Sequence, residues 1–498
     1  MITSAKEVMH KGWPIVAVPH RPDEVLVLRN MGYNPPDPLP MYYDFPGGKT
    51  PFKAQISTAN FASMNSRCFI LNSMGTGKTI SSLWAADYMQ RIKRVNRILV
   101  ACPLSTMQDT WANEAFYNFP DKTVVVIYGT AKQRLKRLEQ EADIYIINTD
   151  GVEIIADALA KRPDIDLIII DELALYRNAS TNRWKAMNRV CNKQTPRKVW
   201  GMTGAPMPHL PTDVWSQIRL VTPTSTAISS SFVRFRELVM RPVGPHKWVP
   251  KEDAVQTVFG LMQPSIRFAL DDCLDLPPQT LVTREVELTP EQKKAYKDMM
   301  KRLKTEYANG EILAVNAAVK AAKLLQISLG VAYGPNKELV VIPSQHRINV
   351  LREIIEESEG KVIVFVPLTG ALEYVAEQLR SEWTVATVSG ATSKSQRDEI
   401  FHNFQRSKDP HVLVANPSTM SHGLTLTAAT TIVWCGPTNS NDTYVQACAR
   451  VRRPGQKRTT VIVHLVGSPI ERVIFERLQG KQELQNVLLD LLKEQKDD

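Results

Sequence analysis

Residues 72–79, which read NSMGTGKT, have the composition of a loop that binds phosphate groups. Glycines let backbone N–H groups approach phosphate oxygens, a lysine reaches the β- and γ-phosphates, and a hydroxyl binds Mg²⁺. The residues in these positions are Met74, Gly75, Thr76, Gly77, Lys78 and Thr79. Asn72 replaces the first glycine of the strict eight-residue signature, so a Gly-rich turn before a core helix is the alternative interpretation.

A second group of reactive side chains follows an apolar run, where Asp171 and Glu172 are adjacent. At the carboxyl end of a buried parallel strand, such acids reach the edge of the sheet at which ligands bind. Asp171 is then expected to hold Mg²⁺ together with Thr79, and Glu172 to orient or deprotonate an attacking water molecule. Acids in the first turn of an ordinary helix are the alternative.

Both groups need a parallel sheet to bring them together, and the apolar runs predict one. Short runs of Val, Ile and Leu between turn residues indicate strands buried on both faces, and alternation with helical stretches indicates a parallel α/β sheet. A first series contains 68–73, 97–102, 124–129, 143–148, 166–171 and 198–204. A second series contains 361–368, 384–390, 411–417, 431–436 and 460–466, and a helical stretch over 290–329 separates the two series.

Changes in composition set the boundaries of the predicted domains. Residues 1–50 are rich in Pro and Gly, and we expect an irregular lead-in with one short hairpin. The remaining predicted parts are a first α/β domain over 51–221, a linker and helical insert over 222–340, a second α/β domain over 341–480, and a C-terminal helix or tail over 481–498. Trp13, Trp248 and Trp383 lie outside the motifs, and we expect them to pack in the cores.

The composition narrows the class of protein. Lys plus Arg outnumber Asp plus Glu by 61 to 51, which gives a formal net charge of +10 and favours a polyanionic partner. No apolar run reaches the roughly 18 residues of a membrane span, and the first residues lack the apolar core of a secretion signal. None of the six cysteines forms a C-x-x-C pair, so we expect neither zinc nor disulfides, and a reducing cytoplasm.

Four further segments resemble motifs of the superfamily-two helicase-like ATPases, and most closely those of the Swi/Snf type. They are VACPLSTMQDTWANEAF (100–116) for motif Ia, WGMTGAPMPHLPTDVWSQIRLV (200–221) for motif III, NPSTMSHGLTLTAA (416–429) for motif V and YVQACARVRRPGQKRTTVIVHLV (444–466) for motif VI. Ala174 stands where the family has His, and Asn72-Ser73 where it has an acidic pair. Thr425 replaces an Asn of many members, which resembles the strand-annealing branch and compact phage-encoded members.

The resemblance implies two tandem RecA-like lobes that bind and hydrolyse ATP with Mg²⁺. Gln55 resembles the glutamine with which the family reads adenine, because an amide group both donates and accepts. An ordinary surface glutamine is the alternative. Gly423 of motif V and Gln446 of motif VI are likewise expected at the nucleotide.

Arginines of motif VI would complete the nucleotide site from the second lobe. Arg450 and Arg453 are spaced so that both side chains lie on one face of a helix. Guanidinium groups in that position stabilise the charge of the phosphoryl-transfer transition state. A solvated basic helix face is the alternative, and we assign the neighbouring Arg452 to solvent or DNA.

Loop tips with small hydroxyls or backbone N–H groups suit phosphate contacts without recognition of bases. In the first lobe the candidates are Ser105, Asn148, Thr149 and Thr203, and in the second they are Thr369, Ser389 and Thr419. Ordinary helix caps and turns are the alternative for each of them.

Taken together, the motifs predict an ATP-dependent translocase on double-stranded or branched DNA that remodels joints, forks or protein–DNA complexes in recombination or repair. A strand-separating helicase on single-stranded DNA or RNA is the main alternative, although no aromatic wedge hairpin is evident. A non-enzymatic nucleic-acid-binding module on a decayed ATPase core is the second alternative, which the intact Lys78, Asp171 and Arg453 disfavour. We expect a monomer near the nucleoid, or in the host cytoplasm if a phage encodes it.

Overall fold

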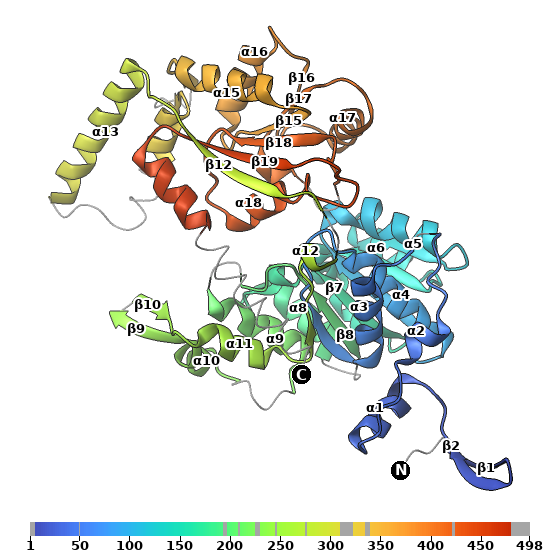
Figure 1. Cartoon of the computed structure of the whole chain (residues 1–498). Coiled ribbons are helices and arrows are strands. Elements are labelled where there is room, and N and C mark those ends of the chain that lie inside the picture. The colour runs from blue at the N-terminus through green and yellow to red at the C-terminus, as the bar shows by residue number, and fades with distance from the viewer. Residues whose placement is uncertain are drawn as a thin grey trace. The chain divides into compact units, whose positions relative to one another are not determined.

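The computed structural model describes residues 5–48, 50–192, 197–207, 210–224, 230–244, 247–273, 276–308, 322–333, 339–420 and 424–479. These residues form two compact units, of which unit 1 ends at Cys273 and unit 2 begins beyond it (Figure 1). Each unit has its own parallel sheet and its own cores. Within the described residues, no helix is both long and apolar enough to cross a membrane.

Unit 1 is built on a seven-stranded sheet with the order β11-β3-β8-β7-β4-β6-β5, in which all neighbouring strands are parallel. The strands are β3 (Arg67–Ile70), β4 (Arg97–Cys102), β5 (Val124–Ile127), β6 (Ile144–Asn148), β7 (Ile165–Asp171), β8 (Lys198–Met202) and β11 (Ser265–Ile266). The predicted strands of the first series are therefore confirmed. Their carboxyl ends lie along one edge of the sheet.

The central strands of this sheet are apolar on both faces, because successive side chains alternate between two cores. Ile168 and Ile170 of β7 lie in one core, and Leu167 and Ile169 lie in the other. The core of Leu167 is covered by α3 (Lys53–Met64), α4 (Lys78–Arg91) and α5 (Asn113–Asn118). The core of Ile168 is covered by α6 (Ala131–Leu138), α7 (Thr149–Ala160), α8 (Asn182–Asn192), α9 (Val214–Val221), α10 (Phe232–Val239) and α11 (Ala254–Leu261).

The predicted linker over 222–340 is divided between the two units. Helices α10 and α11 complete a core of unit 1, β9 (Met240–Gly244) and β10 (Lys247–Pro250) form an antiparallel hairpin, and β11 joins the main sheet beside β3. The short α12 (Leu270–Cys273) ends the unit. The Pro- and Ser-rich composition of this region signals turns, whereas packing decides to which unit the elements belong.

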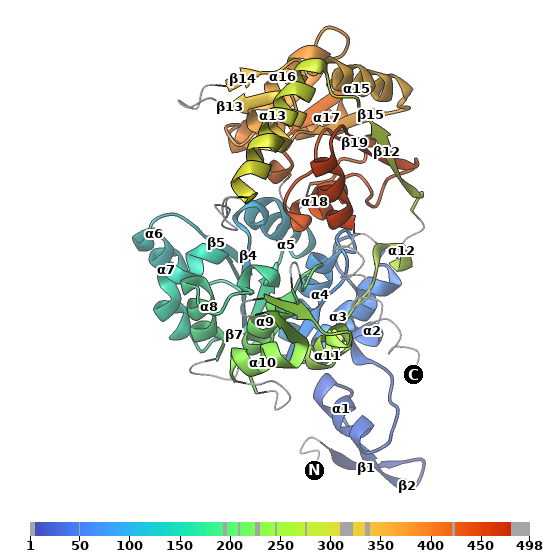
Figure 2. The ribbon, with the colours of Figure 1, turned by 90° about the vertical axis from the view of Figure 1, so that its left-hand side faces the viewer.

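The N-terminal residues contain the expected hairpin, formed by β1 (Lys6–His10) and β2 (Trp13–Ala17), which pair in antiparallel. Helices α1 (Pro22–Asn30) and α2 (Pro38–Tyr42) follow, and Leu39 packs in the core of unit 1. The hairpin stands apart from the sheet of unit 1 in both views (Figures 1 and 2). Trp13 is 74% exposed, so the expectation that it packs in a core is wrong, whereas Trp248 and Trp383 do pack against cores.

Unit 2 has a six-stranded parallel sheet with the order β12-β19-β18-β15-β17-β16. Its strands are β12 (Gln279–Glu285), β15 (Lys361–Phe365), β16 (Val385–Val388), β17 (Val412–Ala415), β18 (Ala429–Trp434) and β19 (Thr460–Val466). The second predicted series is confirmed. Strand β12 escaped prediction because it is an edge strand whose side chains are mostly exposed, so it has no buried apolar run.

Helices cover both faces of this second sheet. One core contains residues of α15 (Gln345–Glu357) and α16 (Thr369–Leu379), and the other contains residues of α17 (Lys394–Arg406) and α18 (Asn441–Cys448). The predicted helical stretch 290–329 appears as α13 (Pro290–Ala308) and a helical segment over 322–328, and residues 309–321 lie outside the described ones. A short antiparallel pair, β13 (Val331–Tyr333) and β14 (Leu339–Val341), precedes α15, and a helical segment covers 469–479.

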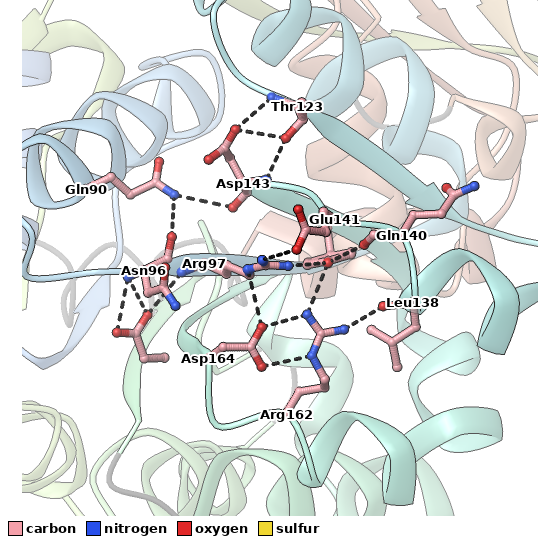
Figure 3. A network of polar contacts seen from close by, with 12 residues as sticks. Gln90, Asn96, Arg97, Thr123, Leu138, Gln140, Glu141, Asp143, Arg162 and Asp164 are labelled. Atoms are coloured by element: carbon pink, nitrogen blue, oxygen red, sulfur yellow. Dashed lines mark hydrogen bonds and ion pairs between the residues drawn. The ribbon is translucent and has the colours of Figure 1, made fainter.

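A network of polar contacts joins the segments in which the strands of unit 1 begin (Figure 3). Arg162 donates to both carboxylate oxygens of Asp164, at 2.8 and 2.6 Å, and Arg97 at the start of β4 contacts the same carboxylate. The hydrogen bonds from Arg162 lower the pKa of Asp164. Because the strands are parallel, this network lies at the edge opposite their carboxyl ends, and it holds the sheet together there.

Candidate nucleotide-binding site

The phosphate loop follows β3 and leads into α4, which is the strand–loop–helix arrangement that the sequence predicts. Gly75 and Gly77 have φ values of 84° and 81°, in the left-handed region that other residues rarely adopt. Gly77 is also the N-cap of the 14-residue α4, so the N–H groups of the first helical turn, which cannot bond within the helix, face the loop. Such a helix end favours an anion. Met74 and Thr79 are half-buried beside these glycines.

Lys78 closes the loop through its ammonium group, which donates to the backbone carbonyls of Asn72 at 2.9 Å and Ser73 at 3.1 Å. Thr76 is 2% exposed, and its hydroxyl donates to the carbonyl of Ser73 at 2.8 Å. The Thr76 side chain therefore braces the loop, and only its backbone is available to a phosphate.

Gln55 lies against the loop, as the resemblance implies. It stands in the first turn of α3, where its Oε1 accepts a hydrogen bond from the N–H of Phe52 at 3.0 Å. Its Nε2 is so close to Gly77 that a Cβ atom at that glycine would lie 2.1 Å from it. Gly77 is thus required both by its backbone conformation and by the approach of Gln55.

The acidic pair ends β7, with Asp171 as the last residue of the strand. The indole N–H of Trp111 donates to one carboxylate oxygen of Asp171 at 2.8 Å, and the N–H of Glu172 donates to the other at 3.0 Å. Burial raises the pKa of Asp171, and the hydrogen bond from Trp111 and the charge of Lys78 act in the opposite direction. Glu172 has a φ of 54°, a left-handed conformation that is strained for a residue with a side chain and that is frequent at functional sites.

The strand order brings the loop and the acids to one place. Strand β8 pairs with β3 on one side and β7 on the other, and Met202 is opposite both Ile70 and Asp171. Thr203 follows directly and its N–H donates to the carbonyl of Ile70 at 3.1 Å. A Cβ atom at Gly204 would lie 3.6 Å from the carbonyl of Asn72. The motif III residues therefore line the same edge, between the phosphate loop and the acids.

Asn72, which departs from the loop signature, joins three segments of unit 1. Its Nδ2 donates to the hydroxyl of Thr58 on α3 at 2.8 Å, and its Oδ1 accepts from the N–H of Phe268 at 2.9 Å. The buried Arg267 donates to the carbonyls of Leu71 and Phe268, both at 2.9 Å. Backbone bonds from Leu71 to Ile266 and from Ser73 to Phe268 continue the pairing of β3 with β11. The start of the loop is thus fixed to the last segment of unit 1.

In unit 2, the arginines of motif VI lie in the turns that follow α18, so the prediction that both stand on one face of a helix is wrong. Arg450 is 1% exposed, and its carbonyl accepts from the N–H of Leu426 at 2.9 Å. Arg453 donates through Nε to the carbonyl of Ala449 at 2.9 Å and through Nη1 to the hydroxyl of Thr425 at 3.4 Å. Motifs V and VI are therefore in contact at Thr425.

The other predicted residues of this region have different positions. Gln446 is half-buried on α18, whereas Gly423 lies outside the described residues. The side chain of Arg452 donates to the carbonyl of Pro277 at 3.1 Å. Arg452 therefore packs on the segment before β12 and is not simply solvated, whereas its assignment to DNA stays a prediction.

Four of the predicted DNA contacts are buried side chains. Asn148 is 7% exposed and accepts from Arg134 at 3.0 Å, and its neighbour Thr149 is 5% exposed. Thr203 is fully buried, and Thr419 is 4% exposed with its hydroxyl bound to the carbonyl of Asn416 at 2.6 Å. Their burial does not support the assignment of these three hydroxyls and one amide to DNA. The residue type indicates that a side chain can cap a helix or a turn, but it does not indicate whether that side chain is buried or exposed.

The remaining candidates are accessible. Ser105 and Ser389 are half-buried and Thr369, the first residue of α16, is exposed. Ser389 also accepts from the N–H of Ala391 at 3.3 Å. Ser105 follows β4 in unit 1, and Ser389 and Thr369 follow β16 and β15 in unit 2, so all three stand at carboxyl ends of strands.

Two family models match the chain. A model of the SNF2-related domain matches residues 54–332, and a model of the helicase conserved C-terminal domain matches residues 346–455. Because the first match alone covers more than half of the 498 residues, the chain belongs to the SNF2-related family. The resemblance to Swi/Snf-type ATPases and the two-lobe α/β fold predicted from the sequence are confirmed, and the domains place the chain among the ATP-dependent helicase-like proteins.

Relatives include protein p41 of Acyrthosiphon pisum secondary endosymbiont phage 1, 25% identical over 442 residues that cover 84% of this chain and 94% of that protein. The SWI/SNF-related matrix-associated actin-dependent regulator of chromatin subfamily A-like protein 1 of Xenopus laevis is also 25% identical, but the match covers 84% of this chain and only 42% of that protein. Among solved structures, the Sulfolobus solfataricus SWI2/SNF2 ATPase core in complex with dsDNA matches with a TM-score of 0.40 and 20% identity, over 89% of this chain and 95% of that one.

Sequence reasoning did not identify Trp111 and Phe268 as residues of the site. Trp111 lies in a π-helical turn, Met107–Ala112, and such turns are frequent at functional sites. It belongs to the segment that resembles motif Ia, yet nothing in that segment indicates that its partner is Asp171, 60 residues later. Phe268 bonds to Asn72 through its backbone N–H, which no composition signal reveals.

Proposed function

We propose that this protein is an ATP-dependent translocase that acts on double-stranded or branched DNA. The observation that carries the proposal is the convergence, at one sheet edge of unit 1, of the phosphate loop with Lys78 and the carboxylates of Asp171 and Glu172. Membership of the SNF2-related family and the helicase C-terminal match over unit 2 support it.

The residues of unit 1 fit a nucleoside triphosphate with a divalent cation. The N–H groups at the start of α4 would bind the phosphates, and Lys78 would exchange its bonds to the Asn72 and Ser73 carbonyls for phosphate oxygens. Thr79 and Asp171 would hold Mg²⁺, since hydroxyl and carboxylate oxygens are its usual protein ligands. The cation neutralises charge on the β- and γ-phosphates.

Hydrolysis then requires a positioned water and a stabilised transition state. Glu172, held by its left-handed backbone, would orient or deprotonate the water molecule that attacks the γ-phosphate. The roles of Arg450 and Arg453, which the sequence leads us to expect in stabilising the charge of the transferring phosphoryl group, stay predictions. Gln55, whose amide lies beside Gly77, would read the adenine.

The protein would contact the sugar–phosphate backbone of DNA, so translocation would not depend on the base sequence. The accessible candidates are Ser105, Thr369 and Ser389. Binding should weaken strongly as salt rises, because neutralised phosphates release counterions.

The test is an ATPase measurement with linear duplex, forked and junction DNA, single-stranded DNA and RNA. We expect the largest stimulation by duplex or branched DNA, whereas stimulation by RNA alone would overturn the choice of substrate. Lys78→Ala should abolish turnover and leave DNA binding largely intact. The control Lys132→Ala removes an exposed lysine of α6 in the same unit and should change neither. Equal turnover in Lys78→Ala and the unmodified protein refutes the nucleotide site.

A further inference from the structure

Trp13 is held at the closed end of the N-terminal hairpin and is largely surrounded by solvent. All ten residues of β1 and β2 are exposed, and Trp13, at 74%, is the most exposed large apolar side chain of the pair. The hairpin extends away from the sheet of unit 1 in two perpendicular views (Figures 1 and 2). An isolated two-stranded hairpin is marginally stable in water at best. A surface of this kind is therefore a candidate for contact with a ligand.

The turn of the hairpin fixes where Trp13 stands. Lys11 and Gly12 are its two turn residues, with φ values of 49° and 82°. Positive φ at both positions is the type I′ geometry, which matches the twist of the flanking strands. His10 and Trp13 close the turn as a directly opposed pair. Trp13 is thus presented by a defined turn and not by a loop of variable shape.

The register sorts the side chains of the hairpin onto two faces. Directly opposed residues project to the same side of a ladder, and successive residues alternate. The pairs Lys6–Ala17, Val8–Ile15 and His10–Trp13 therefore share one face, which we name the aromatic face, and Glu7–Val16 and Met9–Pro14 share the other. The aromatic face carries the aromatic rings and Lys6, with Lys11 at its tip. Glu7, the one acidic residue between Lys6 and Ala17, lies on the opposite face.

We propose that the aromatic face binds unpaired nucleotides of DNA, with a base stacked on Trp13 and the phosphates near Lys6 and Lys11. Aromatic rings beside cations, without a neighbouring acid, form the combination that binds single strands independently of sequence. This inference rests on the proposed function, because a translocase on branched DNA meets unpaired nucleotides at forks and junctions. The hairpin then supplies selectivity for such structures, in addition to the duplex contacts of the lobes.

The experiment compares the affinity of the full chain for a fork with single-stranded arms and for a blunt duplex of the same length. Loss of one stacked base should make Trp13→Ala bind the fork about 5- to 150-fold more weakly. Binding to the blunt duplex and the ATPase activity that the duplex stimulates should stay unchanged. Trp13→Phe keeps an aromatic ring and should restore most of the affinity.

Val16→Ala is the matched control, because Val16 is an exposed apolar residue of the same strand on the opposite face. It should leave binding to both DNAs unchanged. Equal affinity of Trp13→Ala and the unmodified protein for the fork overturns the inference, as does an equal loss in Val16→Ala. Concentration-dependent dimerisation that Trp13→Ala abolishes, measured by sedimentation without DNA, would assign the face to a second copy of the chain and also overturn it. Failure of every DNA to stimulate the unmodified protein refutes the proposed function itself, which is a separate result.

Discussion

The backbone N–H of Phe268 donates to the side-chain oxygen of Asn72 at 2.9 Å. The bond joins the first residue of the phosphate loop to the segment with which unit 1 ends, five residues before Cys273. The amide of Asn72 is suited to this place, because its nitrogen donates to Thr58 while its oxygen accepts from Phe268. A carboxylate at position 72 could accept from Phe268 but could not donate to Thr58, because an ionised carboxylate has no proton to give.

Asn72→Ala should therefore disturb the loop that holds Lys78. It removes the amide oxygen that accepts from the N–H of Phe268 and the amide nitrogen that donates to the hydroxyl of Thr58, and loss of a hydrogen bond to a buried group costs about 1–3 kcal/mol. We expect weaker binding of ATP, by several-fold, and a lower midpoint of chemical denaturation. Both can be measured on the full chain with a fluorescent nucleotide and by urea titration.

Asn65→Ala is the matched control, since Asn65 is the C-cap of α3 in the same unit and its side chain donates to the carbonyl of Phe61, at 2.8 Å. It should lower stability slightly and leave nucleotide affinity unchanged. If Asn72→Ala binds ATP as tightly as Asn65→Ala, the hydrogen bonds of the Asn72 side chain do not position the phosphate loop.

Trp111→Phe should impair the use of Mg²⁺. The indole N–H of Trp111 donates to the carboxylate of Asp171 at 2.8 Å, and a hydrogen bond to a charged group contributes about 1.5–3 kcal/mol. Without it the carboxylate is less well oriented. We expect the Mg²⁺ concentration for half-maximal ATPase activity to rise about tenfold or more, because a loss of about 1.5–3 kcal/mol corresponds to at least that factor in affinity.

Trp84→Phe serves as the comparison, because Trp84 is a buried tryptophan of α4 whose indole donates to the carbonyl of Pro46 at 3.0 Å, away from Asp171. Both variants lose an indole hydrogen bond, but only Trp111→Phe should change the Mg²⁺ dependence. An identical Mg²⁺ titration for the two variants would contradict the positioning role of Trp111.

Glu471→Ala should strongly destabilise unit 2. Glu471 is fully buried and accepts two hydrogen bonds from the buried Arg347, at 2.8 and 3.0 Å. Removal of one partner leaves an uncompensated buried charge and costs about 3–5 kcal/mol. The exposed pair Arg284–Glu357 offers the control, since loss of a surface ion pair costs about 1 kcal/mol or less. Urea denaturation of Glu471→Ala and Glu357→Ala should show this difference, and equal midpoints would contradict it.

His464 should make the stability of unit 2 sensitive to acid. Its ring accepts or donates a hydrogen bond with the Tyr444 hydroxyl at 2.9 Å and stacks on Phe475 with 4.0 Å between ring centroids. Burial lowers the pKa of His464 from 6.5 to about 4. Between these values the unfolded chain binds a proton that the folded chain does not, so stability falls as the pH drops from about 6.5 to about 4.

The measurement is the denaturation midpoint of the full chain at pH 7 and at pH 5. His464→Gln removes the titrating group and should lose less stability than the unmodified protein over this interval, by an amount on the order of 2 kcal/mol. His402→Gln removes an exposed histidine of the same unit and should follow the unmodified protein. A pH response of His464→Gln equal to that of His402→Gln would refute the assignment.

Much of the fold could be predicted from the sequence because the strands are buried on both faces. The run over 165–171 is apolar at four consecutive positions, which a sheet covered by helices on both sides requires. The candidate phosphate loop could also be predicted, because Gly75, Gly77 and Lys78 lie within a few residues of one another in the sequence. Strand β12, whose side chains are mostly exposed, has no buried apolar run and was missed.

The sequence by itself determined which residues are candidates for the chemistry, since loop glycines, a lysine and adjacent acids can be recognised without knowledge of their surroundings. Only the tertiary structure decided their environment: that Trp111 meets Asp171, that Phe268 holds Asn72, and that Thr203 and Thr419 are buried whereas Trp13 is exposed. The reason is physical, because burial and hydrogen bonding between distant segments depend on how the elements pack, and side-chain type alone does not encode a residue's partner.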